Sequence, residues 1–174
     1  MTRTKRLLIL LFVLFATVGC DQATKAAART HLAGENALSF LNGVFYLHYA
    51  ENPGAFLSLG ASLTPEAQYW IFVVMVSAIL LGLAIYLAWA ALREQDRLPL
   101  SVLVALSLFL GGGVGNLIDR LLYDGRVADF MVIRLGWAST GVFNVADMAL
   151  MLALGLVVFS TWHHEREELD GETS

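Results

Sequence analysis

Carboxylate, amide and guanidinium side chains gather in one short stretch of a chain that is otherwise almost continuously apolar. Between Gly111 and Met148 the candidates are Asp119, Asp129, Asp147, Asn116, Asn144 and Arg120. Ionisable groups beside a membrane core are costly, so they are functional candidates by default. Two carboxyl groups that lie close together cannot easily both ionise, and such a pair can share a proton and activate a water molecule.

The spacing of these residues places them on two helix faces. Asn116, Asp119 and Arg120 stand at i, i+3 and i+4, so they share a face if the apolar segment before them stays helical. Asn144 and Asp147 repeat the i, i+3 spacing near the start of the next apolar segment. The two polar faces can therefore meet at one membrane boundary, with a further aspartate supplied by the segment between them. This pattern predicts a site with two carboxylates.

The composition is that of an integral membrane protein. The 174 residues are 57% hydrophobic and only 15% charged, with a mean hydropathy of +0.66, whereas ordinary soluble domains are about 25% charged. The length predicts one domain, residues 1–174. The net charge of −4 lies largely in the last ten residues, which we expect to be a solvated tail, and it gives no sign of nucleic-acid binding.

Four apolar segments set the expected fold class, an all-α membrane protein with four transmembrane helices. The expected spans are residues 7–28, 69–92, 98–118 and 141–162. The first apolar run is short for a span of about 20 residues, but the good helix formers that follow it extend the helix. The glycines at 111–113 and 115 allow close helix packing in a membrane bundle, or access of a peptide backbone to the site.

Two segments are expected outside the membrane on one side, residues 29–68 and 119–140. Alternation and aromatic content in pieces such as Val44–Tyr49 predict two or three short strands lying on the membrane surface. Asn52-Pro53-Gly54 is a turn signal. The second segment is expected to be a loop, in which Asp124 is a solvated turn residue.

Basic residues favour cytoplasmic termini. An even number of spans puts both termini on one side, together with Arg3, Lys5, Arg6, Arg93, Arg97 and Arg166. The opposite side carries Lys25, Arg29, Arg120, Arg126 and Arg134. When Lys25 and Arg120 are assigned to the polar site, six basic residues stand against three, and the excess marks the cytoplasmic side. The polar residues then lie near the outer face.

The N-terminus allows two interpretations. A basic start followed by an apolar run has the form of a secretory signal, and Thr17–Cys20 looks like the lipobox at which bacterial lipoproteins are acylated and cut. The other interpretation is a retained first helix in which Asp21 and Lys25, at i and i+4, form a pair at the membrane surface. An exposed pair of this kind contributes only a few tenths of a kcal/mol. We expect the helix to be retained, because three spans follow it and lipoboxes usually begin with leucine.

Five short motifs occur in order between residues 21 and 147. They are Asp21-Gln22-x-x-Lys25, Asn52-x-Gly54-Ala55, Gly115-Asn116-Leu117-Ile118-Asp119-Arg120, Val127-x-Asp129-Phe130 and Phe143-Asn144-x-Ala146-Asp147. Together they resemble bacterial lipoprotein signal peptidase, also called the signal peptidase II family. One motif departs from the family, which commonly reads Asn-x-Gly-Ala-Ala-Phe, since the second alanine is missing here.

The resemblance implies an intramembrane aspartic endopeptidase of the bacterial inner membrane. Enzymes of that family remove the signal peptide from diacylglyceryl-modified prolipoproteins and cut just before the lipidated cysteine. By resemblance, the catalytic pair is Asp129 and Asp147. The residues that bind substrate or support the site are then Asp21, Lys25, Asn52, Gly54, Asn116, Asp119, Arg120 and Asn144. The expected partners are the prolipoprotein substrates and membrane lipid, and the expected state is a monomer.

No metal or cofactor is expected, because the sequence has no His and Cys clusters with zinc spacing. Two alternatives stay open on the residues alone. A small proton-coupled transporter or channel would also use Asp, Asn and Arg at the membrane boundary, although it would usually place them in the middle of a span. A noncatalytic scaffold, or a lipoprotein anchored at Cys20, is the other.

Overall fold

Long helices make up most of the molecule. The computed structural model describes residues 1–55, 59–93 and 98–172, with side chains up to residue 162. The helices are α1 (Arg3–His31), α2 (Pro65–Gln68), the π-helical segment η3 (Tyr69–Met75), α3 (Val76–Leu92), α4 (Leu100–Leu122) and α5 (Val145–Glu172). Within the described residues, four stretches are long and apolar enough to cross a membrane: Arg3–His31, Pro65–Leu92, Leu100–Leu122 and Val145–Trp162. The predicted fold class is confirmed.

A small antiparallel sheet completes the fold. Its strands are β1 (Leu38–Phe40), β2 (Phe45–Asn52), β3 (Val127–Leu135) and β4 (Ala138–Ser139), in the order β1-β2-β3-β4. The 3-10 turn η1 (Leu41–Gly43) joins the first two strands. Asn52 pairs with Val127 and Phe45 with Ile133, so the end of β2 lies beside the start of β3.

The expectation of a loop over residues 119–140 was wrong. Helix α4 continues to Leu122, and β3 and β4 follow it. The first four residues of β3, Val127–Phe130, are buried, and the strand pairs with β2, which is far away in the sequence. Long-range pairing of this kind leaves little local signal, because the turn residues before β3 dominate the sequence pattern there.

The helix ends also differ from the expected spans. Helix α1 continues to His31, the second span begins at Pro65, and α5 begins at Val145 rather than at residue 141. The late start of α5 has a clear cause, since Phe143 is extended and exchanges backbone hydrogen bonds with Met131 of β3. The acidic tail that was expected to be solvated lies beyond residue 162, outside the described side chains.

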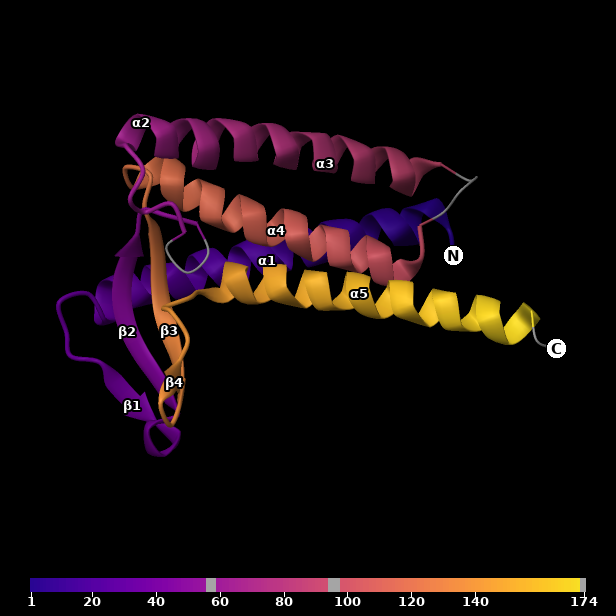
Figure 1. Ribbon diagram of the computed structural model, residues 1–174. Helices are drawn as coiled ribbons and strands as arrows, with labels where there is room; N and C mark the ends of the chain where they lie inside the picture. Colours follow the sequence, from indigo (N-terminus) through magenta and orange to yellow (C-terminus); the bar gives the residue numbers. More distant parts are fainter. Residues whose placement is uncertain (56–58, 94–97, 173–174) are drawn as a thin grey trace.

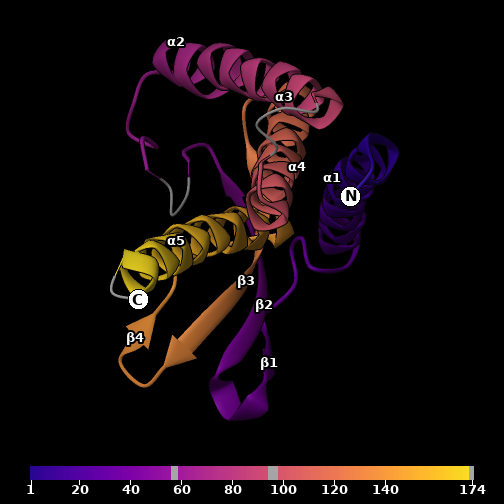
Figure 2. The same cartoon turned by 90° about the vertical axis from the view of Figure 1, so that its right-hand side faces the viewer.

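The sheet and the chain termini lie at opposite ends of the helices. Figure 1 shows the sheet projecting at the end where α4 and α5 meet it, while the N-terminus and the end of α5 lie at the far end. Figure 2, viewed along the helices, shows α4 between α1, α3 and α5. Helix α4 contacts each of these three helices, so it is the centre of the bundle.

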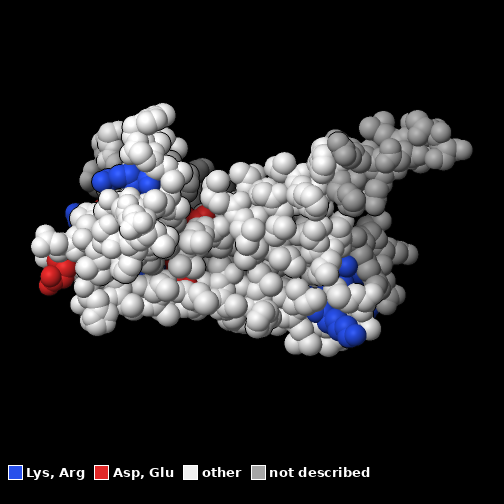
Figure 3. Space-filling model, turned by 90° about the horizontal axis from the view of Figure 1, so that it is seen from below, with Lys and Arg blue, Asp and Glu red and all other residues white. Residues whose placement is uncertain are grey.

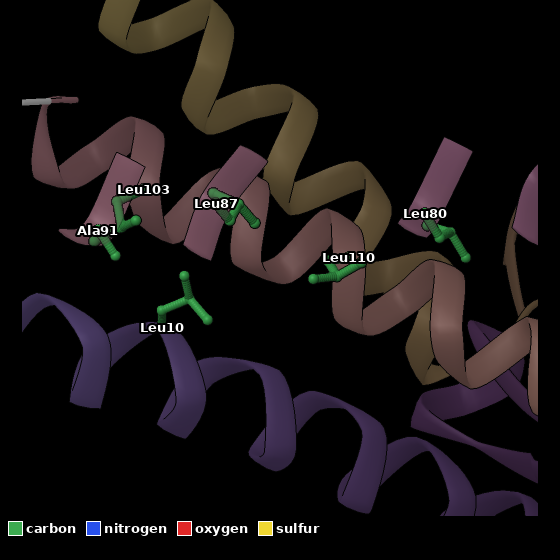
Figure 4. Close-up of a cluster of buried hydrophobic side chains, with 6 residues drawn as sticks. All are labelled: Leu10, Leu80, Leu87, Ala91, Leu103 and Leu110. Carbon is green, nitrogen blue, oxygen red and sulfur yellow. The ribbon is translucent and has the colours of Figure 1, made fainter. Parts of the chain in front are cut away.

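Leucine packing and glycine contacts hold the bundle together. One buried cluster joins α1, α3 and α4 (Figure 4). Its members are Leu10, Leu80, Leu87, Ala91, Leu103 and Leu110. Nearer the sheet, a Cβ at Gly112 would lie 2.7 Å from the carbonyl oxygen of Ala146, and one at Gly111 would lie 2.8 Å from Cβ of Thr17. The packing interpretation of the glycines is therefore confirmed, because α1 and α5 come close to α4 at positions where α4 lacks side chains.

The outer surface of the helices is apolar. Large side chains such as Phe12, Phe15 and Leu81 are exposed, as expected for residues that face lipid. In the view of Figure 3, lysine and arginine gather at the two ends of the long axis, and the band between them is nearly free of charge. This is the surface of a multi-pass membrane protein.

Candidate active site

Polar side chains are buried where the helices meet the sheet. Seven of them are at most 8% exposed: Asp21, Lys25, Asn52, Asp119, Asp129, Asn144 and Asp147. They come from α1, the end of β2, α4, β3 and the start of α5. The fold therefore brings together residues that span more than a hundred positions of the sequence.

Asp129 lies near the start of β3 and accepts two amide hydrogen bonds. Asn52 Nδ2 donates to its Oδ2 at 3.0 Å, and Asn144 Nδ2 donates to its Oδ1 at 2.7 Å. The pKa of Asp129 is raised to about 6: burial is the largest cause and the nearby charge of Asp147 acts in the same direction, while the two amide donors and the charge of Lys25 partly offset them. Asp129 is thus a carboxyl group that can hold a proton close to neutral pH.

Asp147 lies in the first turn of α5 and forms a reciprocal cap with Asn144. The backbone N–H of Asp147 donates to Asn144 Oδ1 at 2.9 Å, and the backbone N–H of Asn144 donates to Asp147 Oδ2 at 3.2 Å. This is the geometry of a capping box, in which the start of a helix fixes both side chains. Asn116 of α4 donates its Nδ2 to Asp147 Oδ1 at 3.0 Å. Both oxygens of Asp147 are therefore held in place.

Asn144 links the two carboxyl groups, because its amide contacts Asp129 and its backbone contacts Asp147. Both carboxyl groups line one cavity of about 290 Å³. The rest of its lining is mostly apolar: Ala55, Phe72, Val76, Ile79, Leu80, Phe109, Gly113, Leu117, Val127 and Leu150, together with Asn52, Asn116 and Arg120. A pair of carboxyl groups at the polar end of an apolar cavity can do acid–base chemistry on a hydrophobic substrate.

Arg120 and Asn52 hold the chain beside the cavity. Arg120 Nη1 donates to the Gly125 carbonyl at 2.8 Å, and its Nη2 makes a short hydrogen bond to the Gly54 carbonyl. The guanidinium also lies 5.0 Å from the ring centroid of Phe72 in η3. Asn52 Oδ1 accepts from the Gly54 N–H at 2.8 Å. The predicted residue Gly54 thus belongs to the site through its backbone, while Phe56 of the same motif lies outside the described residues.

Asp21 and Lys25 form a buried ion pair, and the alternative of an exposed helix-end pair was wrong. Lys25 Nζ lies 2.8 Å from Asp21 Oδ2 and 3.5 Å from Asp119 Oδ2, and all three side chains are fully buried. Lys25 also donates to Asn116 Oδ1 at 2.8 Å. The pair is buried because α4 has a glycine, Gly115, where it faces Asp21.

All ten predicted site residues lie in this one region, and three further residues join them. Gln22 donates to Asp21 and Asp119, and Arg29 forms an ion pair of 2.7 Å with Asp119. Arg29 lies four residues after Lys25 on α1, so the helical period could have indicated it. The third residue, Phe72, lines the cavity and lies beside Arg120, and no spacing or motif in the sequence indicated it. Asp124 lies apart, in the turn after α4, with a φ of 51°.

In the part of the chain that the structure describes, no three His, Cys, Asp or Glu side chains are arranged to hold a metal ion. The polar groups that line the cavity are two carboxyl groups, two amides and one guanidinium. Amide side chains hold the two carboxyl groups in fixed positions, since they donate hydrogen bonds to them.

A family model described as "Signal peptidase (SPase) II" matches residues 13–163, which is most of the chain. The chain belongs to the signal peptidase II family. Proteins named "Lipoprotein signal peptidase" are similar to it over most of its length. The one from Halalkalibacterium halodurans is 32% identical over 147 residues, covering 84% of this chain and 87% of that protein. The one from Desulforapulum autotrophicum is 35% identical over 157 residues, covering 90% and 91%.

A solved structure described as a bacterial membrane enzyme has the same fold. It superposes with a TM-score of 0.70 at 25% identity and covers 92% of this chain and 88% of that one. Family membership identifies the chain as a membrane-embedded protease that processes the signal peptides of lipoproteins. The alternative of a transporter or channel is set aside on this ground.

Proposed function

We propose that this chain is an intramembrane aspartic endopeptidase that removes the signal peptide from diacylglyceryl-modified prolipoproteins by cutting just before the lipidated cysteine. The observation that supports it is the pair formed by Asp129 and Asp147. The two carboxyl groups are buried, they are linked through Asn144, and they line the same apolar cavity.

The proposed reaction uses both carboxyl groups and one water. The ionised member of the pair takes a proton from a water molecule held between them, and the water oxygen attacks the scissile carbonyl carbon. The protonated member donates to the carbonyl oxygen and, as the intermediate collapses, a proton passes to the leaving amine. Asp129 can carry this proton near neutral pH, because its pKa is raised to about 6, chiefly by burial. The proton nevertheless belongs to the pair, since such sites titrate together.

The cavity supports a substrate that is partly peptide and partly hydrocarbon. Its apolar wall comes from η3, α3, α4 and α5, through residues such as Phe72, Ile79, Phe109 and Leu150. A signal peptide helix and acyl chains both gain free energy by contacting such a wall. At the polar end the lining is completed by Asn52, Asn116 and Arg120, beside the carboxyl pair at which the scissile bond would lie.

We further propose a single integral membrane domain that works as a monomer in the bacterial inner membrane. The excess of basic residues in the segments assigned to the side of the termini supports cytoplasmic termini. The site then lies near the outer face, where a translocated prolipoprotein presents its modified cysteine. In this arrangement α1 is retained, because its Asp21 and Lys25 belong to the site's buried polar network.

The test is cleavage of a purified prolipoprotein with and without the diacylglyceryl group. The modified substrate should be cut, and mass spectrometry of the product should find the lipidated cysteine as the new N-terminus. The unmodified substrate should remain intact under the same conditions. Cleavage at another bond, or equal cleavage of both substrates, would contradict the proposal.

A further inference from the structure

The residue directly before each candidate catalytic aspartate is a buried alanine whose backbone N–H is held by a second carboxylate. Ala128 donates to Asp119 Oδ2 at 2.9 Å, and Ala146 donates to Asp21 Oδ1 at 2.9 Å. Both segments read Val-Ala-Asp in the sequence. A second pair of carboxylates therefore holds the backbone one residue before each member of the first pair.

One ammonium group connects these two carboxylates. Lys25 Nζ lies 2.8 Å from Asp21 Oδ2, 3.5 Å from Asp119 Oδ2 and 2.8 Å from Asn116 Oδ1. An ammonium has three donors and no acceptor, so three acceptors match its full capacity. Carboxylates buried without a cation are strongly unfavourable, and removing one member of a buried pair leaves an uncompensated charge.

The two carboxylates depend on Lys25 to different degrees. Asp119 also pairs with Arg29 at 2.7 Å. Asp21 is fully buried, and besides Lys25 its described side-chain partner is the neutral amide of Gln22 at 3.1 Å. Loss of the ammonium therefore affects Asp21, and the peptide before Asp147, more than it affects Asp119.

Lys25 also determines which way the amide of Asn116 points. Because the ammonium can only donate, Asn116 must turn its oxygen toward Lys25 and its nitrogen toward Asp147, where Nδ2 donates to Oδ1 at 3.0 Å. Asn144 Nδ2 donates to the same Asn116 oxygen at 3.1 Å. The orientation of this amide is therefore fixed from two sides.

We infer that Lys25 is a positioning residue that, through Asp21, Asp119 and Asn116, sets the backbone and hydrogen-bond geometry of the catalytic pair. The inference rests on the proposed function, and it assigns Lys25 no contact with the substrate. Lys25 is fully buried and does not line the cavity. Its loss should therefore lower kcat and leave KM nearly unchanged, because the cavity wall stays as it is.

The test compares four variants of the full chain on a diacylglyceryl prolipoprotein, with kcat, KM and Tm measured for each. Lys25→Met should lower kcat about 100-fold, as expected for a misplacement of about 1 Å at the reacting groups, and it should lower Tm. The double variant Lys25→Met with Asp21→Asn should have a kcat at least tenfold above that of Lys25→Met, and it should recover part of the lost Tm. The reason is that the Asn oxygen can still accept from Ala146 and the Asp21 charge is no longer left unpaired. Lys5→Met, an exposed change in the same helix, is the matched control and should have no effect.

A second double variant separates positioning from charge compensation. Like the first double variant, Lys25→Met with Asp21→Ala leaves no unpaired charge at position 21. It offers no acceptor to the Ala146 N–H, however, so its kcat should remain near that of Lys25→Met. Equal activity of the two double variants would overturn the inference, as would loss of folding in both. A Lys25→Met variant with normal kcat, or with a change confined to KM, would also overturn it.

Failure of the proposed function would look different. In that case the wild-type chain does not cut the prolipoprotein at all, and the Tm values still report on the network. The inference then predicts that the Tm loss in Lys25→Met is larger than in the double variant with Asp21→Asn. A double variant with a Tm no higher than that of Lys25→Met would remove the coupling on which the positioning role depends.

Discussion

Replacement of Asp129 by asparagine should stabilise the protein at pH 7.5 and destabilise it at pH 4. Burial raises the pKa of Asp129 from 3.8 to about 6, so the folded state disfavours the ionised form. Above pH 6 this disfavours folding by about 3 kcal/mol, and below pH 4 the effect vanishes because the carboxyl is protonated in both the folded and unfolded states. Wild-type stability should therefore fall as the pH rises from about 4 to about 6.

The Asp129→Asn variant lacks this titration but loses one hydrogen bond. Asp129 accepts from Asn52 and from Asn144, and the new amide nitrogen must face one of these donors, at a cost of about 1 kcal/mol. The variant should therefore be more stable than the wild type by about 2 kcal/mol at pH 7.5 and less stable by about 1 kcal/mol at pH 4.

The assay is unfolding in detergent, followed by tryptophan fluorescence at pH 4, 5.5 and 7.5. Asp124→Asn is the control, because Asp124 is an exposed turn residue near Asp129 in the sequence, and this change should leave the stability close to that of the wild type. A difference between Asp129→Asn and the wild type that stays constant over this range would refute the reasoning. So would a variant that is less stable at pH 7.5.

Three further outcomes follow from contacts around the site. Gly115→Ala should destabilise the protein by about 1 to 3 kcal/mol in an unfolding titration, because its Cβ would lie 2.5 Å from Asp21 Oδ2; wild-type stability would contradict the packing described for α1 and α4. Arg120→Lys should retain part of the cleavage rate, between the wild type and inactive variants, since an ammonium cannot hold the Gly54 carbonyl and a second partner in fixed geometry; a fully active variant would exclude this role. Intact-mass measurement should find α1 in the mature protein, and a mature N-terminus at an acylated Cys20 would refute its retention.

The polar faces of the helices could be predicted from sequence because they depend on local periodicity. Asn116, Asp119 and Arg120 share a face of α4 since the helix continues through them to Leu122. Asn144 and Asp147 are similarly local, and their spacing becomes a capping box at the start of α5. Helical period and helix length suffice for such residues.

The residue pattern indicated Asp129 only as an aspartate from the segment between two polar helix faces, and the family motif gave its role, because its surroundings are non-local. It is held by Asn52 from β2, whose place beside β3 depends on strand pairing across the chain. The local pattern of residues 119–140 indicated a loop, and the helix and strands there form because β2 and the bundle end supply partners.

The sequence pattern did not predict that Asp21 and Lys25 are buried. The spacing of Asp21 and Lys25 predicts a pair at a helix end, but it does not say whether water reaches them. They are buried because Gly115 lets α1 approach α4 closely. The partners Gln22 and Arg29 lie on the same helix, and their roles depend on Asp119 of the neighbouring helix.

The most direct test of the account is cleavage of a diacylglyceryl prolipoprotein by Asp129→Asn and by Asp147→Asn, with substrate binding measured separately. Each change removes one half of the proton-sharing pair and keeps nearly the same volume, so each should abolish cleavage while the variant still inserts into the membrane and still binds substrate. Asp124→Asn should retain most of the rate. Substantial turnover by either the Asp129 or the Asp147 variant would contradict the aspartic mechanism.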